Sequence, residues 1–307
     1  MTCVFIDGSS GTTGLRIHQR LREREDIELI VLPEADRKNP AERRRALNSA
    51  DVVFLCLPDD AAREAVSMVE NERVTVIDTS TAHRTNPDFA YGFAELTGHR
   101  ERIASSRRIA NPGCHASGVI ALVAPLVEAG LLARDALLTS FSLTGYSGGG
   151  KKMIAGYETE RPSLLDAPRQ YGLTQGHKHL PEIVKECGLT RAPVFCPIVA
   201  PYYAGMEVTV ALFREQLAGS IEDVRNALRS YYAQCRLVRY TDRADEDGFL
   251  SAGAFAGRDD MQVCVMGNDE RILLVSRFDN LGKGASGAAI QNMNIVLGLD
   301  ETLGLSV

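Results

Sequence analysis

Short apolar runs, each followed by a more polar stretch, recur along the first quarter of the chain. They lie at residues 2–7, 27–32, 51–57 and 74–78. Short runs of this kind, rich in Val, Ile, Leu and Phe, are typical of strands buried on both faces of a sheet. The segments between them carry apolar residues at helical spacing, as at Leu15, Ile17 and Leu21. The pattern predicts an α/β domain at the start of the chain.

Alternating and amphipathic segments replace this pattern in the second half. Residues 136–144 alternate with period two, and strands are predicted at 194–199, 206–213, 262–266 and 271–278. Residues 221–234 have the pattern of an amphipathic helix, and 155–175 are predicted to be mostly loop. Antiparallel strands grouped with a helix indicate a second, α+β domain. An apolar helix that extends to Leu297 returns the chain to the first domain.

The sharpest local signal precedes an apolar helix predicted at residues 119–132, where Asn111-Pro112-Gly113 leads into Cys114. Pro fixes φ and Gly widens the accessible backbone conformations, so these residues favour a turn. Cys114 is therefore expected at the start of the helix, where backbone N–H groups and the helix dipole stabilise a thiolate nucleophile. The alternative is a cysteine that only fills space, which is the commoner use of a free cysteine.

Composition and charge narrow the class of protein. The chain has 307 residues, enough for two domains, and a net charge of −6. This charge argues against a nucleic acid or an anionic membrane as main partner. Basic residues cluster at residues 43–45, which is predicted to be a solvated helix face.

The seven cysteines are scattered, with no CxxC pair and no zinc-ligand spacing. No metal site is predicted. No signal peptide and no apolar run of membrane-spanning length is evident, so a reduced, cytoplasmic protein is expected.

A glycine turn follows the first predicted strand. Gly8, Gly11 and Gly14 have the spacing G-x-x-G-x-x-G, and the predicted helix begins directly after them. Glycines in this context permit a tight turn and close approach of a dinucleotide pyrophosphate to the helix N-terminus. The alternative is an ordinary strand-to-helix turn without a ligand.

Three further segments border the groove that such a turn would form. After the second strand, Arg37 and Lys38 favour NADP, whereas Glu34 and Asp36 keep NAD open, and surface charge would explain all four. Leu57-Pro58 and Thr79-Ser80-Thr81 follow the third and fourth strands, at the edge where open α/β sheets bind ligands.

A glycine loop and two histidines are the remaining candidates. Gly148-Gly149-Gly150 can pass close to a ligand, although a flexible surface loop fits it equally well. His177 and His179 precede a predicted helix and are the best candidates for a base that pairs with Cys114. A metal site is poorly supported, because no acidic or cysteine partner stands at suitable spacing.

Together these motifs resemble the aldehyde-forming acyl-phosphate reductases, most closely the N-acetyl-γ-glutamyl-phosphate reductases of arginine biosynthesis in their short form. The resemblance covers nearly the whole chain. It is carried by the glycine turn at residues 8–14, Asn111–Cys114, Gly148–Gly150, the stretch His177–Ile183 and Asn280–Gly284. Many members have Tyr-Pro-Thr after the cysteine, whereas this chain has His115-Ala116-Ser117, which leaves the role of His115 open.

The resemblance implies a Rossmann domain of residues 1–113 and 283–307, and a catalytic and oligomerisation domain of residues 114–282 with a mostly antiparallel sheet. It implies NADP(H), a small acyl-phosphate substrate and a homodimer or homotetramer. Cys114 matches the nucleophile that forms a thioester, and His177 the acid/base that protonates the reduced intermediate. His179, Lys152 and Arg108 are the candidates for substrate binding. The candidates for cofactor binding are Gly8, Ser10, Gly11, Thr12, Thr13, Gly14, Arg37, Leu57, Pro58, Ser80, Ser117, Gly148, Gly149 and Asn280.

Two alternatives share part of this pattern. Aspartate-semialdehyde dehydrogenase has the same chemistry and fold, but residues 176–183 and the short Gly148–Gly150 loop fit it less well. A regulatory protein that binds NADP and turns nothing over would keep the glycine turn but need no reactive Cys114.

Overall fold

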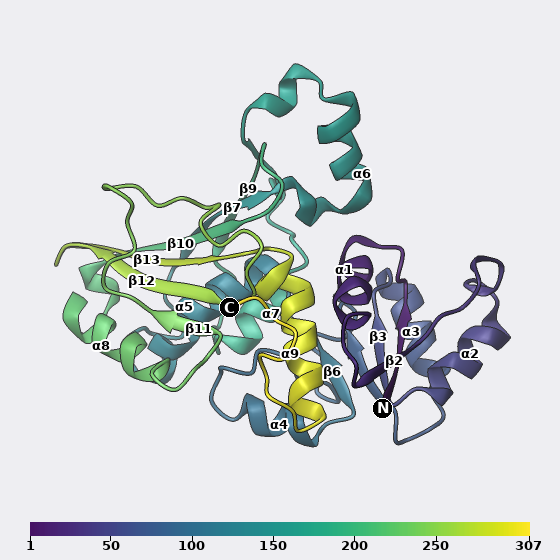
Figure 1. Cartoon of the computed structure of the whole chain (residues 1–307). Coiled ribbons are helices and arrows are strands. Elements are labelled where there is room, and N and C mark those ends of the chain that lie inside the picture. The colour runs from purple at the N-terminus through teal and green to yellow at the C-terminus, as the bar shows by residue number, and fades with distance from the viewer. The chain divides into compact units, whose positions relative to one another are not determined.

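The computed structural model describes residues 1–307, and the chain divides into two compact units (Figure 1). The first unit contains residues 1–112 and 285–305, and the second contains residues 113–284 and 306–307. The first unit thus recruits a segment from near the end of the chain. It also contributes the strand that leads to Cys114, while Cys114 itself belongs to the second unit.

The first unit is built on a parallel sheet with strand order β2-β1-β3-β4-β6-β5. Its strands are β1 (Thr2–Asp7), β2 (Ile27–Ile30), β3 (Val52–Leu55), β4 (Thr75–Asp78), β5 (Ala90–Tyr91) and β6 (Arg108–Ala110). The side chains of β3 and β4 are wholly buried, as expected for central strands covered on both faces.

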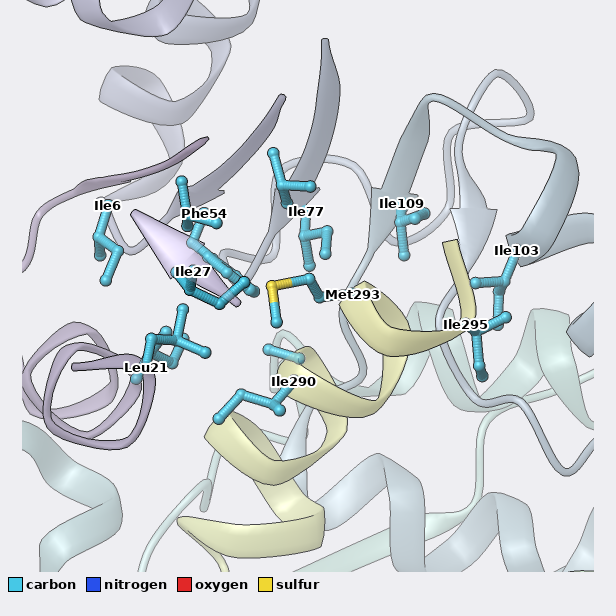
Figure 2. Packing of buried hydrophobic residues seen from close by; sticks show 14 of the residues in the cluster. Ile6, Leu21, Ile27, Phe54, Ile77, Ile103, Ile109, Ile290, Met293 and Ile295 are labelled. Carbon is cyan, nitrogen blue, oxygen red and sulfur yellow. The ribbon is translucent and has the colours of Figure 1, made fainter. Parts of the chain in front are cut away.

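Helices supply the rest of this unit's core. They are α1 (Thr12–Leu21), the 3₁₀ turn η1 (Glu34–Asp36), α2 (Pro40–Ser49), α3 (Asp59–Ser67), α4 (His99–Ser105) and the returning helix α9 (Gly287–Val296). Ile290 and Met293 of α9 belong to one buried cluster with Phe54 and Ile77 of the sheet (Figure 2). The apolar face of α9 therefore explains why the end of the chain joins the first unit.

The second unit has a seven-stranded mixed sheet with strand order β11-β12-β13-β10-β7-β9-β8. Its strands are β7 (Thr139–Gly145), β8 (Arg169–Gln170), β9 (Val194–Ala200), β10 (Met206–Phe213), β11 (Val238–Tyr240), β12 (Met261–Gly267) and β13 (Arg271–Phe278). Only β7 with β9 and β11 with β12 pair in parallel. The predicted fold class, α/β with a mostly antiparallel second sheet, is confirmed.

The helices of this unit are α5 (Cys114–Glu128), α6 (Gly150–Ala155), α7 (Leu180–Glu186) and α8 (Ile221–Tyr231), with short helical segments η2 (Tyr146–Gly149), η3 (Gly156–Glu160), η4 (Ser163–Asp166) and η5 (Arg214–Gln216). A further segment, η6 (Gly282–Ser286), includes residues of both units. The helices α5 and α8 pack on the sheet, and α7 packs against α5. The helix α5 crosses β10 and β13 at Gly118, where a Cβ atom would lie 2.4 Å from a methyl group of Val208. Close approach at this point therefore requires glycine.

Several expectations from the sequence need correction. The stretch 155–175 is not mostly loop but contains the end of α6, two single-turn segments and β8. Weak periodicity hid these turns because each is too short to develop an amphipathic face. The strands β5 and β6, of two and three residues, are also absent from the prediction, because they are too short to show an alternating pattern. The basic run at 43–45 is not wholly solvated, since the Arg43 guanidinium is buried against Asp7 at 2.9 Å.

No helix of the structure combines the length and the apolar character needed to cross a membrane.

Candidate active site

The turn before the cysteine is anchored from the first unit by Asn111, which is 1% exposed. Its backbone N–H donates to the carbonyl of Asp78 at 2.7 Å, and its side chain donates to the carbonyl of Ala285 at 3.0 Å. The carbonyl of Asn111 accepts from Arg84 at 2.9 Å, and its side-chain oxygen accepts from Asn292. A residue with both donor and acceptor groups is thus needed here, and Asn supplies them.

Cys114 is the first residue of α5, as the sequence predicted. Gly113 precedes it as N-cap and supplies no capping side chain, so the helix dipole acts directly on the thiol. The N–H of Gly113 donates instead to the carboxylate of Glu182 at 3.1 Å. On the other side, a Cβ atom at Gly284 would lie 2.9 Å from the Cβ of Cys114, so glycine at that position leaves room for the nucleophile.

The three histidines of this unit lie together at the cysteine end of α5. The ring of His115, the residue after the nucleophile, lies 6.1 Å from the ring of His177 and 5.6 Å from that of His179. The rings of His177 and His179 are 4.7 Å apart. The distant stretch 176–183 is thereby brought to the cysteine turn, with the half-buried His177 more exposed than the buried His179.

Glu182 joins these two parts and was missed by the sequence analysis. It is 1% exposed, holds the N–H of Gly113, and places its other oxygen 4.0 Å from Nε2 of His179. Its position three residues after His179, on the first turn of α7, was visible in the sequence. Its contact with a residue 69 positions away was not.

His115 is buried and neutral. Burial, reinforced by the nearby His177, lowers the pKa of His115 to about 3. Its Nδ1 is hydrogen-bonded to Ser142 Oγ, and its Nε2 lies 2.6 Å from the hydroxyl of Tyr171. Such a ring carries no acidic proton to donate near neutral pH, and both of its nitrogens are already hydrogen-bonded, so His177 and His179 are the better candidates for the acid/base.

Two glycines of the turn in the first unit are required by close contacts with the protein backbone. Gly8 has φ +87°, and a Cβ atom there would lie 2.3 Å from the carbonyl of Cys56. A Cβ atom at Gly14 would lie 2.5 Å from the carbonyl of Gly8. At the first residue of α1, the hydroxyl of Thr12 is buried without a hydrogen-bond partner, which is the group a phosphate oxygen would satisfy.

A cavity of about 320 Å³ lies beside this turn. It is lined by the glycine turn, by the end of β2 and by charged side chains after β2, among them Gly8, Ser10, Leu57, Glu34, Arg37 and Lys38. Arg37 and Lys38, which favour a 2′-phosphate, line this cavity together with Glu34, one of the two acids considered for NAD. Asp36, the other acid considered for NAD, does not line the cavity. The residues of this unit fit an NADP cofactor.

The other predicted cofactor residues lie in both units. In the first, Ser80 is buried and donates to Asp78, and Pro58 precedes α3. In the second, Ser117 donates to the carbonyl of Gly113, and Asn280 donates to Ser147 beside Gly148. Gly149 ends η2.

The two predicted substrate cations differ in setting. Lys152 is exposed on α6. Arg108 lies at the amino end of β6, where its guanidinium donates to the carbonyls of Val74 and Arg107. Ligands of parallel sheets bind at the opposite, carboxyl edge, so this geometry gives Arg108 no support as a substrate ligand.

Two family models match the chain, and their limits agree closely with those of the two compact units. The family model "Semialdehyde dehydrogenase, NAD binding domain" matches residues 3–106, and "Semialdehyde dehydrogenase, dimerisation domain" matches residues 114–280. A curated N-acetyl-γ-glutamyl-phosphate reductase of Burkholderia lata is 46% identical over 302 residues, covering 96% of both chains. The reductase of that name from Brucella suis is 48% identical over 305 residues, covering 96% of this chain and 98% of the relative.

Solved structures agree on the fold. Aspartate semialdehyde dehydrogenase II of Vibrio cholerae complexed with ASA superimposes with a TM-score of 0.72 at 17% identity, covering 97% of this chain and 98% of that one. Aspartate semialdehyde dehydrogenase of Candida albicans with NADP gives a TM-score of 0.65 at 18% identity, covering 97% and 98%. The chain therefore belongs to the semialdehyde dehydrogenase family and, within it, to the group of the N-acetyl-γ-glutamyl-phosphate reductases.

The lowered pKa of His115 predicts a pH-dependent stability. Folded His115 gains a proton only near pH 3, whereas the unfolded chain does so near the ordinary value of 6.5. Between these values the unfolded state binds more protons. The stabilisation is therefore complete above pH 6.5 and declines as the pH falls, by at most about 1.4 kcal/mol per pH unit. Urea unfolding of wild type and His115→Gln between about pH 4 and 7 should show a shallower decline for the variant. Identical slopes would contradict the buried, neutral ring.

Proposed function

We propose that this protein is an NADP-dependent reductase of arginine biosynthesis. It converts N-acetyl-γ-glutamyl phosphate to N-acetylglutamate 5-semialdehyde and phosphate. The observation that carries the proposal is Cys114 at the start of α5, with a buried carboxylate and two histidines gathered at the same turn. The relatives that are 46% and 48% identical carry the name of this activity, which supports the choice over aspartate-semialdehyde dehydrogenase.

Cys114 is the proposed nucleophile. Its thiolate attacks the acyl carbon of the substrate, and the bond from that carbon to the phosphate oxygen breaks. Inorganic phosphate departs, and the acyl group remains on the Cys114 sulphur as a thioester. The helix start of α5 favours the charged thiolate. Glu182 keeps the turn in place through the N–H of Gly113.

His177 is the proposed acid/base. Bound NADPH supplies the hydride that reduces the thioester carbonyl. His177 donates a proton to the resulting oxyanion, and it accepts the same proton back when the thiohemiacetal collapses to the free aldehyde and the Cys114 thiolate. The half-exposed position of His177, with its Nδ1 held at 3.3 Å by the N–H of His179, supports this role. His179 and Lys152 are proposed to contact the substrate.

The two functions divide along the chain. We propose residues 1–113 with 283–307 as the cofactor domain and 114–282 as the catalytic domain. The compact units at 1–112 with 285–305 and at 113–284, and the two family matches, support these limits.

Two substitutions test the assigned chemistry. Cys114→Ala should abolish turnover and leave NADPH binding intact, because Cys114 neither lines the cavity beside the glycine turn nor belongs to the predicted cofactor residues. His177→Asn should lower kcat by about 100-fold or more if it is the acid/base. His179→Asn is the matched control, and a loss confined to that variant would move the role to His179. Normal turnover by Cys114→Ala would contradict the covalent mechanism.

The reverse reaction tests the substrate. Protein is mixed with NADP, inorganic phosphate and N-acetylglutamate semialdehyde, and NADPH is followed by absorbance, with aspartate semialdehyde in a parallel sample. Phosphate-dependent NADPH formation with the acetylated substrate alone is expected. Signal only with aspartate semialdehyde would move the protein to the sister activity. No signal from protein that binds NADP would favour a regulatory role.

We also propose a homodimer formed through the face of the second sheet that lies opposite α5. Residues 244–251 cover part of this face. Elsewhere it exposes large apolar side chains such as Phe141 on β7 and Leu273 on β13, 44% and 40% exposed. Residues that pair across neighbouring strands share a face of the sheet, and Phe141 is linked in this way to Val275 through Thr209. Leu273 is two residues from Val275 on the same strand, so it lies on the same face as Phe141. Matching of this unit to a dimerisation-domain model supports the proposal.

Charge placed on this face should separate the protomers. Phe141→Glu with Leu273→Glu buries two unpaired carboxylates in the proposed interface, so light scattering should report a monomer. Leu299→Glu, at a leucine 38% exposed in the first unit, is the control and should leave the mass unchanged. An unchanged mass in the double variant would place the interface elsewhere.

A further inference from the structure

His115 links two hydroxyl groups deep in the second unit. Its ring is 2% exposed, and its two nitrogens contact Ser142 on β7 and Tyr171 after β8. Ser142 is wholly buried on the face of the sheet that α5 covers. The hydrogen bonds of Ser142, His115 and Tyr171 therefore connect the core with the histidine rings, since the ring of Tyr171 lies 5.9 Å from that of His177.

The single N–H of a neutral histidine limits the directions that the hydrogen bonds of Ser142, His115 and Tyr171 can take. A neutral imidazole has one N–H and one lone pair, so it donates to one of its two hydroxyl partners and accepts from the other. When Ser142 donates to Nδ1, the Nε2–H donates to the Tyr171 oxygen. The phenolic proton of Tyr171 is then free to be donated to a third group. His115 remains neutral throughout, as its lowered pKa requires.

The position of Tyr171 is fixed by the backbone. Its N–H donates to the carbonyl of Pro197 at 2.9 Å. The next residue, Gly172, has φ +65°, and a Cβ atom there would lie 3.2 Å from the Pro197 ring. Burial, and second the charge of a Cys114 thiolate, raise the pKa of the Tyr171 hydroxyl. Tyr171 is thus a protonated phenol, and its hydroxyl is held 2.6 Å from Nε2 of His115, the residue that follows the nucleophile.

We propose that Tyr171 donates a hydrogen bond to the carbonyl oxygen of the acyl group carried on Cys114, and that His115 is the positioning residue that directs the phenolic proton there. The proposal rests on Cys114 being the nucleophile. It gives His115 a role that the residue type alone did not indicate: the ring orients a donor and transfers no net proton. A preorganised donor of this kind stabilises the oxyanion that develops when the carbonyl is attacked or reduced.

Removing the phenolic hydroxyl is the direct test. Tyr171→Phe should lower kcat about 100-fold, the effect of losing one oxyanion donor, with KM for the acyl phosphate nearly unchanged. The matched control is Tyr202→Phe. It removes another buried tyrosine hydroxyl, one without a hydrogen-bond partner, and should retain wild-type kcat.

A double-mutant cycle tests the role of His115. His115→Phe keeps a ring of similar size without hydrogen bonds and should match the loss in Tyr171→Phe. The double variant should be less than about threefold worse than Tyr171→Phe, because both substitutions remove one interaction. His115→Gln retains an amide donor, so its kcat should be higher than that of His115→Phe. It also replaces His115→Phe in the cycle if the Phe variant does not fold.

Iodoacetamide labelling of Cys114 separates this proposal from the assignment of the nucleophile. Labelling at the wild-type rate in Tyr171→Phe is expected, since the phenol acts on the acyl oxygen and not on the resting thiol. An unreactive Cys114 in the wild-type protein would overturn the proposed function itself. With Cys114 reactive, three results would overturn the tyrosine proposal: wild-type kcat in Tyr171→Phe, losses that multiply in the double variant, or labelling lost in Tyr171→Phe.

Discussion

One hydrogen bond joins the cysteine turn to the segment that carries the histidines: the N–H of Gly113 donates to the buried carboxylate of Glu182. A carboxylate that is 1% exposed is costly unless it is paired, so the turn and α7 hold each other in place. The other oxygen of Glu182 lies 4.0 Å from Nε2 of His179, so the same carboxylate connects the cysteine turn with one of the two candidate histidines. Loss of this contact would take a backbone donor away from a buried carboxylate and remove the hydrogen bond that joins α7 to the turn carrying the nucleophile.

The second sheet serves different purposes on its two faces. On one, α5 approaches closely at Gly118, which brings its first turn, with Cys114 and His115, above β7. On the other, exposed Phe141 and Leu273 provide the surface proposed for a second protomer. Alternation along the strands assigns each residue to one face, so the chemistry and the proposed assembly are built from the same strands without competing for positions.

Patterns that are local in the chain were predictable from the sequence. The strands at 206–213 and 271–278 have the bounds that alternation predicted, and the helix start at Cys114 followed from its Asn-Pro-Gly turn. Interactions set by tertiary contact were not. Arg43 looked like part of a solvated run, yet it pairs with buried Asp7. The partners of His115 lie 27 and 56 residues away, so no spacing near the cysteine indicates them.

Cys114 is expected to become covalently attached to the acyl group of the substrate during turnover. Protein is incubated with NADP and N-acetylglutamate semialdehyde in the absence of phosphate, and its intact mass and proteolytic peptides are measured. Oxidation of the thiohemiacetal leaves a thioester that has no phosphate to release it, so the acyl mass should appear on the peptide containing Cys114 and disappear when phosphate is added. NADPH formation with no adduct on that peptide, or an adduct on another residue, would contradict the account.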